Sequence, residues 1–75
     1  MRFYFDIHDD QGVWPDEEGQ ELADVQAAEI EAARSLAGVA EARISGQQHR
    51  MAVQVRTAHG PLFEAAFSFE LRLLQ

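Results

Sequence analysis

Apolar and polar residues alternate in three stretches of the chain, which is the pattern of half-buried β-strands. These stretches cover residues 3–8, 51–56 and 62–71. A turn at His59-Gly60-Pro61 separates the last two, which predicts a β-hairpin. The apolar positions expected to form the core of this sheet are Phe3, Phe5, Ile7, Met51, Val53, Val55, Phe63, Phe67 and Phe69. The positions expected to face outward into solvent are Tyr4, Asp6, His8, Gln54, Arg56, Glu64 and Ser68.

A single amphipathic helix is predicted between the first strand and the hairpin. Asp24 is placed to cap it, because a carboxylate can accept hydrogen bonds from the free amides of the first turn. The composition then becomes alanine-rich, and Gly46 is a plausible C-terminal stop, although Gly38 could weaken the helix or end it earlier. Three- and four-residue spacings predict one apolar stripe made of Val25, Ala28, Ala32, Leu36 and Val39.

The segment between the first strand and the helix is rich in turn residues. Residues 9–12 (DDQG) form one turn, and residues 16–20 (DEEGQ) form a second. Between them, Val13 and Trp14 can pair as a very short strand that Pro15 ends. The whole chain, residues 1–75, is therefore predicted to be one small α+β domain of β(β)αββ order. It should have one mainly antiparallel sheet of three to four strands, with a single helix on one face.

The charge of the chain excludes several classes of partner. The formal net charge is −7, the six basic residues are all Arg, and ten of the 13 acidic residues lie between Asp6 and Glu31. Binding to nucleic acid depends on basic groups that neutralise phosphates, and an anionic membrane repels an acidic surface, so neither partner is expected. The chain has no cysteine, no apolar run long enough to span a bilayer and no signal-peptide pattern, which favours the cytoplasm.

One cluster could bind a metal ion. His8 lies among several carboxylates, and the candidate ligands are His8, Asp6, Asp10 and Glu17. Their spacing partly follows a calcium-binding loop, but Gln11 stands where such a loop needs Gly, and His is a poor calcium ligand. The interpretation that we favour is a solvated acidic turn in which His8 pairs with a neighbouring acid. No cofactor is therefore expected.

Four apolar residues could contact another protein: Trp14, Ile30, Leu73 and Leu74. Trp14 either forms a recognition surface or folds over the open edge of the core. Ile30 lies on a second helical line beside the core stripe, and the leucines add apolar surface near the C-terminal end. Because a small domain with open sheet edges tends to associate, we expect a homodimer or an unidentified protein partner.

No catalytic motif is present, since the sequence lacks a nucleophile elbow, a P-loop, a dinucleotide fingerprint and a zinc signature. The sequence therefore predicts a non-enzymatic protein-interaction module. The alternative is a small metal- or ligand-binding protein that uses His8 and the acidic turns.

Four segments carry a resemblance to a known family: residues 2–9 (RFYFDIHD), 16–22 (DEEGQEL), 24–28 (DVQAA) and 67–69 (FSF). In this order they resemble a family of short bacterial proteins, mostly alphaproteobacterial, that is classed as a domain of unknown function. Its pattern is an R-Y-F-F-x-x-H-D-G strand, an acidic D-x-x-G turn, an alanine-rich helix and a C-terminal β-hairpin. This chain departs from it by carrying DQG at residues 10–12 in place of a tighter D-G turn. The resemblance implies a fold and a bacterial cytosolic setting, and it implies no catalytic residue.

Overall fold

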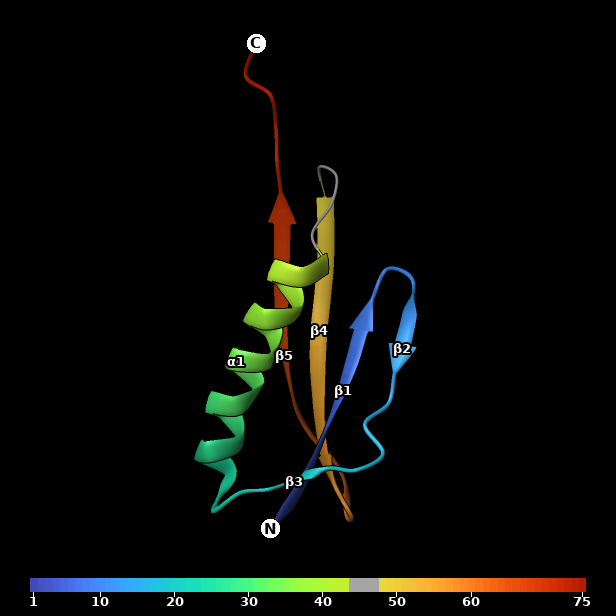
Figure 1. Cartoon of the computed structure of the whole chain (residues 1–75), viewed down its shortest axis with the longest axis vertical. Coiled ribbons are helices and arrows are strands. Elements are labelled where there is room, and N and C mark those ends of the chain that lie inside the picture. The colour runs from blue at the N-terminus through green and yellow to red at the C-terminus, as the bar shows by residue number, and fades with distance from the viewer. Residues whose placement is uncertain (44–47) are drawn as a thin grey trace.

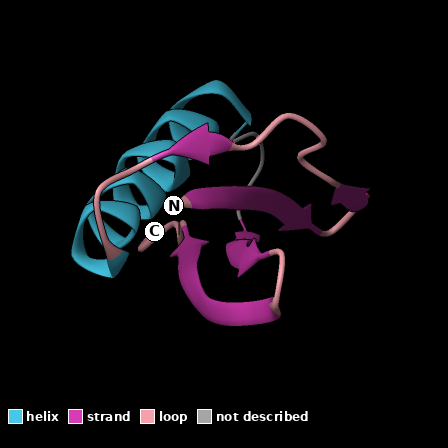
Figure 2. Ribbon diagram, turned by 90° about the horizontal axis from the view of Figure 1, so that it is seen from below, coloured by secondary structure: helices cyan, strands magenta, loops and turns pink. Residues whose placement is uncertain are grey.

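A computed structural model describes residues 1–43 and 48–75 of the chain. In chain order the elements are β1 (Arg2–Asp9), β2 (Gly12–Trp14), β3 (Gln20–Glu21), α1 (Val25–Arg43), β4 (Gln48–Thr57) and β5 (Gly60–Glu70). The strands form one curved sheet, and α1 lies against one face of it (Figures 1 and 2). The predicted α+β class, with a mainly antiparallel sheet and a single helix, is confirmed.

The main sheet has the strand order β2-β1-β4-β5, and every neighbouring pair is antiparallel. The predicted hairpin is present, and its register places Met51 opposite Phe67 and Val55 opposite Phe63. β3 was not predicted. Its two residues pair with Arg2 and Phe3 at the start of β1, where the sequence indicated only a turn. A two-residue strand is too short to show alternation, so its pairing depends on tertiary contacts.

The core lies between α1 and the central strands. Its buried residues are Phe3, Ala28, Ala32, Leu36, Ala40, Met51, Val53 and Val55. Phe5, Ile7, Phe63 and Phe67 pack against this core and are partly buried. Val25, predicted for the apolar stripe, is exposed. The reason is visible in Figure 1, where the N-terminal end of α1 diverges from the sheet.

The start of α1 agrees with the sequence. The Asp24 carboxylate accepts a hydrogen bond from the backbone amide of Ala27 at 2.8 Å, as an N-cap does. The helix continues through Gly38, and the stop expected at Gly46 lies outside the described residues. Within the described ranges, no helix combines the length and the apolar character needed to cross a bilayer.

Two glycines provide a matched test of this fold. Gly19 has a φ of +74°, and an added Cβ would lie 2.8 Å from Tyr4 Cε2, whereas Gly38 lies in α1 with open space around it. Gly19→Ala should lower the free energy of unfolding by more than the roughly 1–2 kcal/mol that a left-handed backbone costs, because it also clashes. Gly38→Ala should raise it by about 0.5–1 kcal/mol. Urea unfolding measures both, and equal effects would contradict the described backbone.

Candidate functional site

The most buried polar group of the described chain is the Asp6 carboxylate on β1. Asp6 is 9% exposed, although the sequence placed it on a solvated face. Arg56 on β4 explains the difference, since its Nε donates a hydrogen bond to Asp6 Oδ2 at 2.8 Å. Arg56 is directly opposite Tyr4 and therefore diagonal to Asp6, a position from which a long side chain can reach. The expectation of a solvated Asp6 was wrong because it did not include this ion pair.

Asp16 joins the acidic loop, which is the segment between β2 and β3 (residues 15–19), to the Asp6–Arg56 pair, and the three residues form one polar cluster. Its backbone amide donates to Asp6 Oδ1 at 2.8 Å, and its carbonyl accepts from Arg56 Nη2 at 2.8 Å. Its carboxylate accepts from the amides of Phe5, Glu18 and Gly19, each at 3.1 Å. One side chain thus shapes its own turn and also ties that turn to β1.

These contacts set the charge state of Asp16. Partial burial opposes ionisation, yet the pKa of Asp16 is held below its usual value. The cause is the three backbone amides, from Gly19, Phe5 and Glu18, which donate to the ionised carboxylate, with a smaller contribution from the charge of Arg56. Asp16 is therefore an ionised structural anchor.

Arg56 makes one further contact on this face. Its guanidinium carbon lies 4.5 Å from the centre of the Tyr4 ring, in a cation–π arrangement. The sequence showed a lone Arg among outward positions of the strand at residues 51–56. It could not show which residues lie opposite, because the register joins segments about 50 residues apart.

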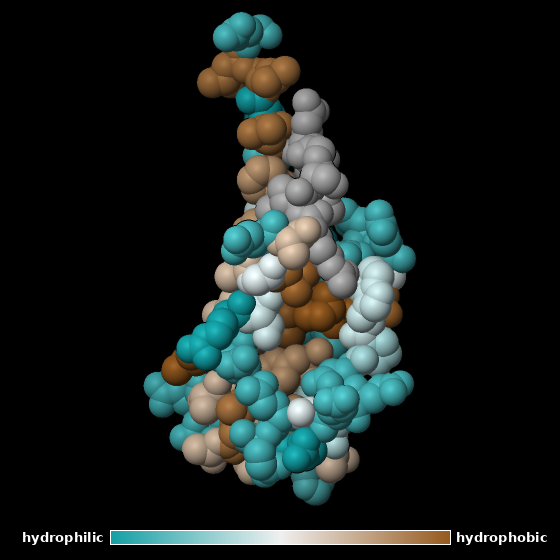
Figure 3. All heavy atoms as spheres, viewed as in Figure 1, coloured by the Kyte–Doolittle hydropathy of each residue, from teal (hydrophilic) through white to brown (hydrophobic). Residues whose placement is uncertain are grey.

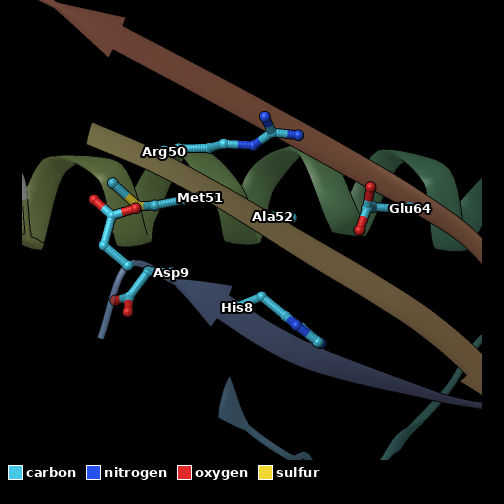
Figure 4. Close-up of a pocket in the computed structure, with 7 residues that line it drawn as sticks. His8, Asp9, Arg50, Met51, Ala52 and Glu64 are labelled. Carbon is cyan, nitrogen blue, oxygen red and sulfur yellow. The ribbon is translucent and has the colours of Figure 1, made fainter. Parts of the chain in front are cut away.

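A shallow hollow lies farther along the same outer face of the sheet. Its volume is about 190 Å³, and it is lined by His8, Asp9, Asp10, Arg50, Met51, Ala52 and Glu64. His8 and Asp9 come from β1, Arg50, Met51 and Ala52 from β4, and Glu64 from β5 (Figure 4). Ala52 is opposite His8 in the register, so a small side chain leaves room between the larger ones.

The four candidate metal ligands are not brought together. Asp6 is engaged by Arg56 and Asp16, His8 lines the hollow beside Asp10, and Glu17 is exposed in the acidic loop. In the described part of the chain, no three His, Cys, Asp or Glu side chains are grouped so that they could hold a metal ion.

The four candidate contact residues lie on separate surfaces. Trp14 is 41% exposed and is opposite Ile7, so it sits at the β2 edge on the helix side of the sheet. Ile30 is exposed on α1. Leu73 and Leu74 are 78% and 96% exposed and follow the end of β5.

The pH dependence of stability tests the role of Asp16. A lowered folded-state pKa adds stability that is complete above the ordinary value of 3.8 and is lost as the pH falls through the folded-state value. Asp16→Asn places an NH₂ group or a weaker acceptor at the Phe5 amide. It should therefore lower the free energy of unfolding by about 1–3 kcal/mol near neutral pH. This difference from the wild type should shrink in acid.

Thermal unfolding from pH 7 to pH 2 measures this difference. Glu17→Gln is the control, because it removes one carboxylate from an exposed neighbouring position. If Asp16→Asn had no larger effect than Glu17→Gln, Asp16 would not be an anchor.

Residues 2–68 match DUF6894, a domain of unknown function. No curated protein and no solved structure matches the chain. Because the matched residues cover β1 to most of β5, and thus nearly the whole domain, the chain belongs to the DUF6894 family.

Proposed function

We propose that the chain is a non-enzymatic protein-interaction module that binds through the free edge of β5 and the segment that follows it. The observation that carries this proposal is the contrast between the two edges of the sheet. One edge is formed by β2, of three residues, and the other by β5, of eleven.

The β2 edge has features that oppose further pairing. It is short and ends at Pro15, and the acidic loop and β3 continue along β1 beyond it. Short edge strands, Pro and charged residues are common means of preventing unwanted strand pairing.

The β5 edge has few of these features. Among the described residues, β4 is the strand that pairs with β5, which leaves the backbone groups on its other side without a strand partner. Its only charged residues are Glu64 and Glu70, and residues 65–69 (AAFSF) carry no charge. An edge of this kind is suited to β-augmentation, in which an added strand completes the hydrogen bonds.

The segment after β5 supplies apolar surface beside this edge. Leu71, Leu73 and Leu74 are exposed, and the segment projects past α1 and β4 (Figures 1 and 3). Exposed leucines in one short segment are typical of a contact surface.

The polar cluster of Asp6, Asp16 and Arg56 is engaged in internal contacts, which is consistent with a non-enzymatic module. Asp6, Asp16 and Arg56 satisfy one another and nearby backbone amides, so their hydrogen-bonding capacity is used to hold the fold. This arrangement favours a structural role for the cluster.

Self-association is the simplest test. The wild-type chain should show a sedimentation coefficient that rises with concentration. Leu73→Asp should raise the dissociation constant about tenfold or more, because it removes a leucine from the contact. Ile30→Asp is the matched control, since it makes the same kind of change on α1. A monomer at all concentrations, or dissociation by Ile30→Asp alone, would contradict the proposal.

A second candidate function is small-ligand or metal binding in the hollow beside His8. The observation that favours it is that His8, Arg50 and Glu64 line one hollow on the outer face of the sheet. Its volume suits an ion or a ligand of a few atoms, since pockets for drug-sized ligands measure about 300–1,000 Å³.

Thermal shift and calorimetric titration with Zn²⁺, Mn²⁺, Ca²⁺ and Mg²⁺ test the metal form of this candidate. Binding to the native state alone raises the melting temperature, and His8→Ala should remove the rise. An unchanged melting temperature and no heat with all four ions would exclude metal binding.

A further inference from the structure

We infer that two copies of this chain pair through β5 in an antiparallel register centred on Ser68, so that residues 62–74 of one copy lie along residues 74–62 of the other. The inference rests on the proposed function and names the partner, which is a second copy of the chain. Twofold symmetry makes such a contact self-complementary, because each copy contributes the same segment.

The open edge sets the geometry of this contact. β5 is antiparallel to β4, and a second β5 added to the free side would continue the sheet across the symmetry axis. Directly opposite residues of an antiparallel pair lie on the same face. An axis perpendicular to the sheet therefore keeps both helices on the same face.

The helix-side face of this register is apolar throughout. Met51, Val53 and Val55 mark this face on β4, and their partners on β5 are Phe67, Ala65 and Phe63. In the sequence the same alternation continues through Phe69, Leu71 and Leu73, and the proposed pairing extends β5 past Glu70 to include the two leucines. Pairing around Ser68 sets Phe67 opposite Phe69, Ala65 opposite Leu71, and Phe63 opposite Leu73 of the second copy.

Aromatic contacts gather beside the axis. Within one chain the Phe67 and Phe69 rings already stack, with centres 6.5 Å apart and an interplanar angle of 16°. Because Phe67 of each copy is opposite Phe69 of the other, four rings meet there. Aromatic pairs contribute stability beyond the area that they bury.

The outer face supplies charge complementarity. In this register Glu64 is opposite Arg72 of the second copy, and symmetry repeats the pair. Glu64 lies on β5, where its carboxylate accepts a hydrogen bond from Gln54, and within one copy the exposed Arg72 forms an ion pair with Glu70 at 2.8 Å. Opposite charges that face each other across strands stabilise the pairing.

Neighbouring registers fit less well. Centring on Phe67 sets Glu64 opposite Glu70 twice, and like charges in opposite positions are unfavourable. Centring on Ala66 leaves Leu73 and Leu74 without a strand partner. Centring on Phe69 sets Glu64 opposite Leu74 and separates it from Arg72.

Cysteine cross-linking tests the register directly. The chain contains no cysteine, so a single introduced thiol reports one position. Ser68→Cys should form a disulfide-linked dimer under mild oxidation, because cross-strand Cα atoms at the axis fall within the range that a disulfide spans. Ala66→Cys is the control. In this register residue 66 is opposite residue 70 of the second copy and is too far from residue 66 of that copy to form a disulfide. A linked dimer of Ala66→Cys, with no linked dimer of Ser68→Cys, would overturn the register.

A charge exchange tests the Glu64–Arg72 pair. Glu64→Arg and Arg72→Glu should each raise the dimer dissociation constant about tenfold or more, since two attractive pairs become repulsive. The double variant should recover most of the affinity. Glu29→Arg and Arg34→Glu, on exposed positions of α1, control for the change in net charge.

The possible outcomes distinguish a failure of self-association from a failure of this register. A wild-type chain that stays monomeric at every concentration overturns both the dimer and the proposed self-association. A chain that dimerises without cross-linking at Ser68→Cys, or without recovery in the charge-exchanged double variant, overturns this register and leaves an interaction through β5 standing.

Discussion

The ion pair between Asp6 and Arg56 is the interaction on which the rest of the fold depends. It joins β1 to β4 across the outer face of the sheet, and the backbone of Asp16 completes it from the acidic loop. That loop leads to β3 and then to the Asp24 cap of α1. Partly buried opposite charges are stable only when their remaining hydrogen bonds are satisfied, and here the Asp16 amide and carbonyl satisfy them. One cluster therefore connects the paired strands β1 and β4 to the segment that leads to the helix.

The same cluster makes the sheet asymmetric. It ties the acidic loop to β1, so the β1 side of the sheet is occupied by short strands and charged turns. The opposite side ends at β5, which is longer and nearly free of charge. The acidic residues hold the loop together, and in the proposed function they also keep this edge from pairing. In the proposed dimer the contact forms at the other edge, where the leucines after β5 are exposed.

Patterns that are local in sequence were predicted well, and those that depend on register were not. Alternation identified the strands that hold Phe3, Met51, Val53 and Val55, because period-2 patterning belongs to a single strand. The Asp24 cap is equally local. Asp6 was assigned to solvent and proposed as a metal ligand because its partner lies 50 residues away and only strand register brings the two together. β3 has two residues and no pattern of its own. The hollow beside His8 depends on three strands and could not be seen in any one of them.

The central claim is that the free edge of β5 is the contact surface. Hydrogen exchange at the backbone amides of β5 tests this claim most directly. Amides that point toward β4 are hydrogen-bonded in the single chain and should be protected at any concentration. The alternate amides, which point to the free side, should be protected in concentrated solution and should exchange rapidly after dilution. If these alternate amides exchange rapidly at every concentration, β5 is not paired and the account is contradicted.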